Sequence, residues 1–202
     1  MLVSDRYRRF QRSQLEPEEA AEVERVAAIA AGLDEYLTSR SEAIDHAHQL
    51  HAGSKLIQYI VGDYLEPLGF VAEYKVSGPG DYAGAARADF YYQPPDGHGI
   101  LVEVERGGVR TNNHDLKDLW KAHLSPQVQH LFLIVPMANW RADGRARERP
   151  FQRMPSRFAA FFQSPRQWID ILSLHVFGYG PLELHLDGEA PSPGSTAGVG
   201  TS

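Results

Sequence analysis

Apolar positions in the N-terminal third of the chain recur with the period of a helix. The stretch SKLIQYIVGDYLEPLGF, residues 54–70, spaces its apolar side chains at i, i+1, i+4 and i+5, which predicts an amphipathic helix closed by Pro67 and Gly69. Upstream, residues 16–32 begin with acidic residues and end in glycine, the composition of a helix start and stop. A further helix is predicted over residues 34–49. This part of the chain is therefore expected to be helical.

The pattern then changes to that of strands. Residues 70–78, 87–94 and 99–108 are short, rich in aromatic and β-branched residues, and end in Gly or Pro turn signals. They predict an antiparallel meander of three strands. VQHLFLIVP, residues 128–136, is a nearly continuous apolar run, which is typical of a strand covered on both faces. Because a helix is predicted just before it, we expect this strand to run parallel to the third one through a right-handed crossover.

That intervening helix is predicted over residues 112–126. Asn112 or Asn113 can cap its start, and Pro126 follows its end. Its buried side is expected to carry the apolar side chains of Leu116, Leu119, Trp120 and Leu124.

The C-terminal third is predicted to be peripheral. An arginine-rich loop is expected over residues 140–157, where Trp140 is a candidate for contacting a partner. A short helix over residues 155–165 and late strands over residues 169–180 and 181–188 follow. The whole order predicts an α/β protein with a mixed central sheet flanked by helices.

At 202 residues the chain has room for one domain with a sizeable core. We expect a helical N-terminal extension at residues 1–50, the α/β core at residues 51–189, and a disordered tail at residues 190–202, where Pro, Gly and Ser dominate.

Composition limits the classes of protein that remain. There is no cysteine, which excludes a disulfide framework or a thiolate metal site and suits a cytoplasmic protein. No apolar run is long enough for a membrane span, and the charged N-terminus has no apolar stretch behind it that would make a signal peptide. The net charge of −6 argues against non-specific coating of nucleic acid, yet residues 109–157 hold nine basic against four acidic residues. This excess predicts either a positive face or solvated arginines on a loop.

Two carboxylates interrupt the strand GILVEVERGG. Alternation along a strand places Glu103 and Glu105 on one side, with Val102 and Val104 on the other. At that spacing the two charges repel by about 2.5 kcal/mol at an effective dielectric near 20, so a cation, a shared proton or basic neighbours must offset them. Antiparallel pairing would bring Asp89 of the preceding strand beside Glu103, and three such carboxylates suit Mg²⁺. The alternative is that Glu103 and Glu105 only form ion pairs at a strand end, with Arg106, Arg110 or Lys117.

An acid on one strand, then a hydrophobic strand that ends in an acid-x-acid motif, then a helix and a buried strand, resembles the PD-(D/E)XK nuclease superfamily. The resemblance covers roughly residues 54–136. It implies a restriction-endonuclease-like core of order α-β-β-β-α-β and a Mg²⁺-dependent DNA endonuclease, in which Mn²⁺ can substitute. Asp89 would then match the first metal-binding acid and Glu103 the second. Glu105 stands where most members have Lys, and it would be a further ligand or the general base.

The same resemblance assigns roles to the helix that follows. Some members carry the lysine on this helix, so Lys117 would supply the missing positive charge. Double-stranded DNA would be contacted by basic and polar residues near the site: Arg106, Arg110, Asn113, His114 and Lys121. A palindromic target of a restriction or phage-defence enzyme would favour a homodimer.

Two alternatives remain open at this stage. The Lys-to-Glu departure and the acidic N-terminal helix favour a non-catalytic module that keeps the fold to bind nucleic acid or protein. A ribonuclease or a repair nuclease with the same metal site would also fit, because target choice resides in loops.

Overall fold

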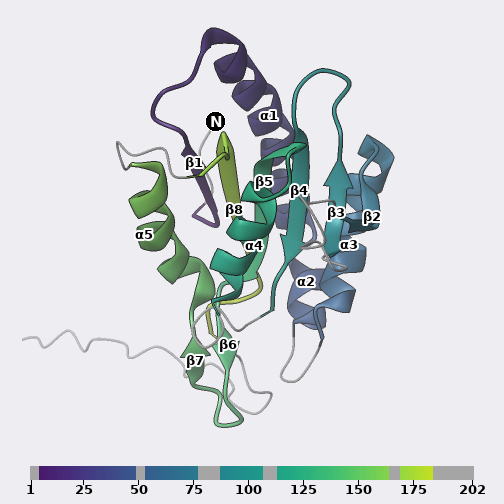
Figure 1. Cartoon of the computed structure of the whole chain (residues 1–202). Coiled ribbons are helices and arrows are strands. Elements are labelled where there is room, and N and C mark those ends of the chain that lie inside the picture. The colour runs from purple at the N-terminus through teal and green to yellow at the C-terminus, as the bar shows by residue number, and fades with distance from the viewer. Residues whose placement is uncertain (1–4, 49–52, 77–86, 107–112, 164–168, 184–202) are drawn as a thin grey trace, which may run out of the picture.

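A six-stranded mixed sheet forms the centre of the molecule (Figure 1). The computed structural model describes residues 5–48, 53–76, 87–106, 113–163 and 169–183. In the sheet, β4, β5 and β8 are parallel, and the remaining neighbours are antiparallel. The strands, in their order across the sheet, are β1 (Tyr7–Gln11), β8 (Ser173–Tyr179), β5 (Val128–Pro136), β4 (Gly99–Val104), β3 (Arg87–Tyr92) and β2 (Val71–Lys75).

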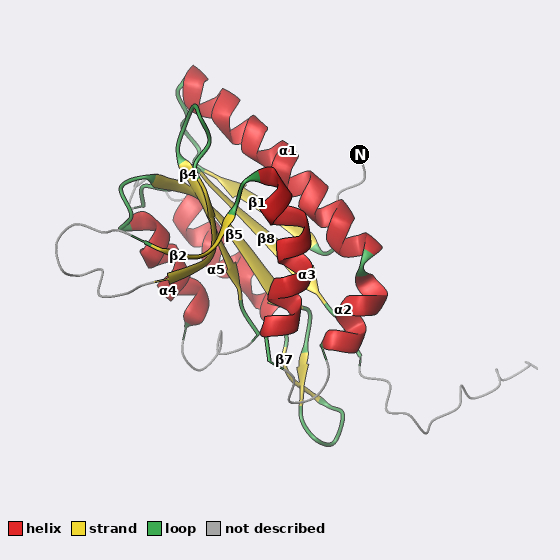
Figure 2. Ribbon diagram, turned by 90° about the vertical axis from the view of Figure 1, so that its right-hand side faces the viewer, coloured by secondary structure: helices red, strands yellow, loops and turns green. Residues whose placement is uncertain are grey.

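Helices cover both faces of this sheet (Figure 2). One face packs against α1 (Pro17–Ser39), α2 (Ser41–Ala47) and α3 (Lys55–Leu65), and the other against α4 (His114–His123) and α5 (Pro150–Phe162). A short 3-10 turn, η1 (Glu66–Leu68), follows α3. The α/β class, the β2–β3–β4 meander and the parallel β4–β5 pair confirm the predictions from the sequence. No helix in the described part of the chain is long and apolar enough to cross a membrane.

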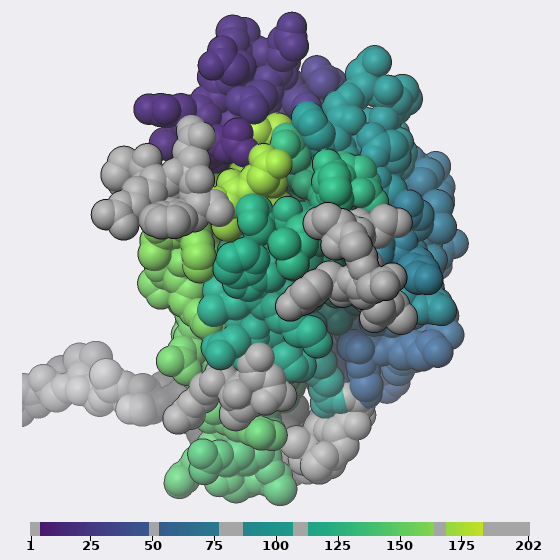
Figure 3. All heavy atoms as spheres, in the orientation of Figure 1, coloured from purple at the N-terminus to yellow at the C-terminus, as the bar shows by residue number. Residues whose placement is uncertain are grey.

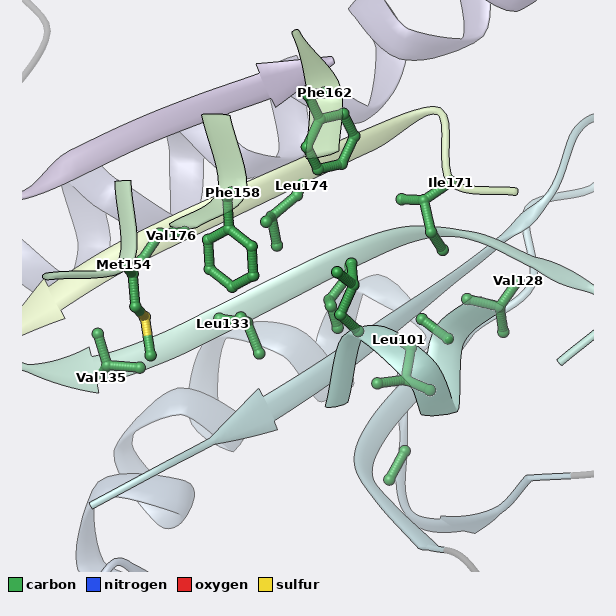
Figure 4. Packing of buried hydrophobic residues seen from close by; sticks show 14 of the residues in the cluster. Leu101, Val128, Leu133, Val135, Met154, Phe158, Phe162, Ile171, Leu174 and Val176 are labelled. Carbon is green, nitrogen blue, oxygen red and sulfur yellow. The ribbon is translucent and has the colours of Figure 1, made fainter. Parts of the chain in front are cut away.

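The alternating side chains of the central strands build two cores. Leu101, Leu133 and Leu174 face α4 and α5, where Met154 and Phe158 fill the space between helix and sheet (Figure 4). The neighbouring positions face α1 and α3, as Val102 and Phe132 do. Eight of the nine β5 residues are buried, which explains their nearly uniform apolar character.

The N-terminal region differs from its prediction at Gly32. This glycine does not end the first helix, because α1 continues to Ser39. Gly32 lies against α3, and a Cβ atom there would collide with the hydroxyl group of Tyr64, whose ring stacks on Tyr36. Close packing therefore explains the glycine. No pattern in the sequence indicated β1, an edge strand that pairs antiparallel with β8.

The arginine-rich segment is not the loop that was predicted. It forms an antiparallel hairpin of β6 (Asn139–Trp140) and β7 (Ala146–Glu148), after which α5 starts at Pro150 and accommodates Pro155 within it. Trp140 is buried, so it is not exposed to a partner. β8 confirms the strand predicted within residues 169–180. Of the strand predicted at residues 181–188, only residues 181–183 are described, and they are not in a strand; the tail lies outside the described residues.

Candidate functional site

The ends of β3 and β4 meet α4 at a buried group of carboxylates. Val102 and Val104 pack into the core on the α1–α3 side. Glu103, between them, is only 5% exposed and reaches Lys121 on α4. The alternation predicted for this strand is confirmed, and it places the charged side chains on the α4 side.

Asp89 lies where the pairing of β3 with β4 stops. The last paired residues are Phe90 and Val102. One step further, the Asp89 carboxylate replaces the ladder by accepting the backbone N–H of Val104 at 2.7 Å, and it accepts a second hydrogen bond from the Gln58 amide of α3 at 2.9 Å. Burial raises the pKa of Asp89, although the Val104 N–H opposes that rise. Gln58 was not predicted as a site residue, because a single glutamine in an amphipathic helix looks like an ordinary surface residue in the sequence.

Lys121 is the cation of the group. Its ammonium lies 2.6 Å from Glu103 and 3.3 Å from Asp118, and it donates to the backbone carbonyl of Arg87 at 3.1 Å. Burial and the nearby Asp118 charge raise the pKa of Glu103 despite this pairing. Burial alone would lower the pKa of Lys121, but Glu103 and Asp118 raise it. The lysine is therefore firmly charged, and it is outnumbered by acids.

Asp118 enters the group because α4 is rolled away from its predicted orientation. Trp120 and Leu124, predicted to be buried, are 52% and 47% exposed, whereas Asp115 and Asp118 are buried. Polar contacts fix this roll: Asp118 pairs with Lys121, and Arg157 of α5 donates one guanidinium N–H to Asp115 Oδ1 at 3.1 Å, with the same nitrogen 3.0 Å from Oδ2. The Asp118 Oδ2 atom is buried with no donor among the described residues.

Glu105 continues the row of acids toward solvent. Its side chain is 22% exposed and lies 3.1 Å from the His114 ring at the start of α4. Its backbone is held on both sides, because its N–H donates to Ile134 and its carbonyl accepts the Tyr179 hydroxyl. Burial is the main cause that raises the pKa of Asp118. Lys121 lowers this pKa, and the charge of Glu105 raises it further.

The remaining predicted residues fall in different places. Lys117 is exposed on the outer side of α4 and is not brought to the carboxylates; Lys121 takes that place. Asn113 has a left-handed backbone with φ of 50° and forms no side-chain cap, because its Oδ1 accepts a hydrogen bond from Arg157 instead. The Arg106 carbonyl accepts a hydrogen bond from Asn139. Arg110 lies outside the described residues.

Carboxylate oxygens are the donors that a hard cation such as Mg²⁺ prefers. Among the described residues, no three His, Asp or Glu side chains are grouped as metal ligands, because Asp89 is bonded to Gln58 and Val104 while Glu103 is bonded to Lys121. Mg²⁺, however, is usually held by one or two carboxylates and keeps several waters. An excess of buried acids and the unpartnered Asp118 oxygen fit such an ion.

Comparisons with known proteins add little to this geometry. No protein-family model and no curated protein matches the sequence. Among solved structures, the chain is similar to restriction endonuclease BGLII complexed with a DNA 16-mer, with a TM-score of 0.39 and 14% sequence identity. The match covers 62% of this chain and 54% of that chain, so this chain spans about half of that protein's length. A likeness of this size does not by itself identify a family.

Proposed function

We propose that this protein is a Mg²⁺-dependent endonuclease that hydrolyses phosphodiester bonds in double-stranded DNA. The observation that carries the proposal is that Glu103 of β4 and Asp118 of α4 both contact the half-buried Lys121, while Asp89 and Glu105 lie near enough to raise the pKa values of these two acids. Four carboxylates belong to this group: Asp89, Glu103, Glu105 and Asp118. We extend the proposal to a cytoplasmic restriction or phage-defence enzyme that acts as a homodimer on a palindromic site.

Asp89 and Glu103 would hold the metal ion, with Glu105 as a further ligand. Mn²⁺ would substitute, since it prefers similar oxygen donors. When bound, the ion supplies Lewis-acid stabilisation of the phosphate charge and a lowered pKa for a bound water. Asp118, whose Oδ2 has no donor among the described residues, is available to the same ion or to its waters.

The chain's own residues would do the rest. Glu105 would accept a proton from the attacking water, and the His114 ring lies 3.1 Å from its carboxylate. Lys121, rather than Lys117, would stabilise the charge that develops on the phosphate. All three of its N–H donors are engaged, so a phosphate must displace one partner, and the 3.3 Å contact to Asp118 is the longest of them. His114, at the start of α4, would contact the phosphate as well.

A cleavage assay paired with metal titration tests this function. Supercoiled plasmid is incubated with Mg²⁺ or Mn²⁺, and Mn²⁺ binding is followed calorimetrically. We expect the wild type to nick the plasmid and to bind the ion. Glu103→Gln and Asp89→Ala should lose cleavage by at least about 100-fold, since each removes a ligand. Asp63→Asn, an exposed acid on α3, is the matched control and should cleave normally.

The alternative of a non-catalytic binding module predicts a different pattern. DNA binding without metal binding or cleavage on DNA and RNA substrates would support that module and refute the nuclease. Cleavage confined to RNA would keep the metal site and refute the choice of DNA.

A further inference from the structure

The β6–β7 hairpin lies beside the carboxylate group. It follows β5 directly, and β5 runs parallel to β4, so both leave the sheet at the edge where Glu103 and Glu105 lie. The ribbon extends beyond the ends of the sheet strands in two views (Figures 1 and 2) and forms the lower end of the molecule in the space-filling view (Figure 3). We call residues 139–149 the arginine hairpin.

The base of the arginine hairpin is fixed to the site. The Asn139 amide donates to the Arg106 carbonyl, one residue after Glu105, at 2.5 Å and to Glu148 across the hairpin at 3.0 Å. Trp140 is buried, with its ring 4.9 Å from that of His48. The root of the hairpin is therefore tied to the strand end that carries Glu105.

The tip of the hairpin is a tight turn. The Arg141 N–H donates to the Arg145 carbonyl at 2.9 Å, and the Gly144 N–H donates to the Arg141 carbonyl at 3.0 Å. Gly144 has φ of 77°, which a glycine adopts without strain. Asp143 accepts the Arg145 N–H at 3.0 Å. The backbone of the tip is thus satisfied by its own groups.

Within the described ranges, the arginine side chains of the hairpin have no acidic partner. Both acids of the segment are used internally, Asp143 by a backbone N–H and Glu148 by Asn139. Three arginines elsewhere in the described chain pair with acids: Arg9, Arg12 and Arg157. Four exposed arginines of the hairpin form no ion pair with any described residue: Arg141, Arg145, Arg147 and Arg149. In a chain of net charge −6, these four arginines form a local positive patch that attracts anions.

We propose that the arginine hairpin is a ribbon that enters the major groove of duplex DNA and contacts its phosphates next to the carboxylate group. Guanidinium groups bind phosphate in a bidentate manner, and unpaired ones do so without first breaking an ion pair. A two-stranded ribbon fits the major groove of B-form DNA, which is about 12 Å wide, but not the deep, narrow one of A-form RNA. The proposal rests on the proposed function and assigns it a DNA-contacting surface.

Equilibrium binding without cleavage tests the proposal. A fluorescent 30-base-pair DNA is titrated with the full chain in EDTA at several salt concentrations. Arg141→Gln/Arg145→Gln should weaken binding at least about fivefold and reduce the slope of log K against log salt by about two, one for each lost phosphate contact. Arg25→Gln, an exposed arginine on α1, is the control and should leave both values unchanged. Arg145→Lys should retain most of the slope, because it keeps the charge.

Each other result has a distinct meaning. Double-variant binding equal to that of the wild type, or no DNA binding by the wild type, would overturn the ribbon. Equal affinity for duplex RNA would overturn its placement in the major groove. Plasmid cleavage with a normal affinity of the double variant would refute the ribbon and leave the nuclease. The expected loss of affinity without any cleavage in Mg²⁺ would support the ribbon and refute the proposed catalysis.

Discussion

Asp118→Asn should stabilise the protein, although Asp118 is buried and in contact with Lys121. Glu103 and Asp118 lie 2.6 and 3.3 Å from one ammonium, so their oxygens are no more than about 6 Å apart. Two negative charges at that distance repel by roughly 3 kcal/mol at an effective dielectric of about 20. Attraction to the Lys121 ammonium opposes this, but the pKa of Asp118 is raised despite Lys121, so burial and repulsion from the neighbouring acids outweigh that attraction. Asparagine keeps the shape, removes one charge, and leaves Glu103 to pair with the lysine.

The gain should depend on pH in a fixed direction. Burial and neighbouring acids raise the pKa values of Glu103 and Asp118, so the folded state binds more protons than the unfolded state. Such a group contributes stability at low pH and loses it as the pH rises through the folded-state pKa, by up to about 1.4 kcal/mol per pH unit for each proton. We therefore expect Asp118→Asn to be more stable than the wild type by about 1–3 kcal/mol near pH 8 and by much less near pH 5.

Urea unfolding in EDTA at a series of pH values measures this difference. Asp63→Asn, which removes an exposed acid, should match the wild type throughout. A loss of stability in Asp118→Asn near pH 8, or a gain equal at both pH values, would refute repulsion as the dominant effect.

Two further changes test contacts away from the site. Glu22 is buried, and hydrogen bonds from His130 and His98 overcome that burial and lower its pKa to about 2. The ionised Glu22 stabilises the fold above its unfolded-state pKa, and this stabilisation is lost as the pH falls. Glu22→Gln should therefore lower the free energy of unfolding by roughly 2–3 kcal/mol near neutral pH and make it depend less on acid pH. Acid unfolding identical to that of the wild type would contradict this. Gly32→Ala should destabilise the protein by about 1–3 kcal/mol, although this substitution usually stabilises a helix. In thermal melts, adding Tyr64→Phe should recover most of the lost stability. A single variant more stable than the wild type would disprove the clash.

The strands that carry the site could be predicted because the spacing of apolar residues and the turn residues are properties of short sequence segments. The alternation of GILVEVERGG is enough to put Glu103 and Glu105 on one side, and the continuous apolar run of β5 is enough to make it a central strand. Gly32 misled the prediction for a physical reason: a helix-ending glycine and one that admits a neighbouring ring look the same in sequence. The edge strand β1 depends on a partner 160 or more residues away, which no local pattern reveals.

The orientation of α4 could not be predicted from the sequence, because hydrophobic burial and ion pairing favour different sides of this helix. Hydrophobic burial alone favours turning Trp120 inward, and that was the prediction. The observed roll instead buries Asp118 and exposes Trp120, since Lys121 is needed beside Glu103 and Arg157 beside Asp115. Ion pairs with strands and helices distant in sequence thus decide which side of α4 is buried.

This roll also bears on the departure at Glu105. A lysine two residues after Glu103 would place its charge on the α4 side of β4, the side on which the Lys121 ammonium lies from the helix. On the proposed function, Lys121 would supply from the helix the positive charge that the resemblance expects on the strand, while the Glu105 carboxylate lies beside His114. Glutamate at position 105 would then be compatible with the proposed chemistry. Lys121→Met is the decisive change, since it should abolish cleavage while Lys117→Met, on the exposed side of the same helix, should leave cleavage intact.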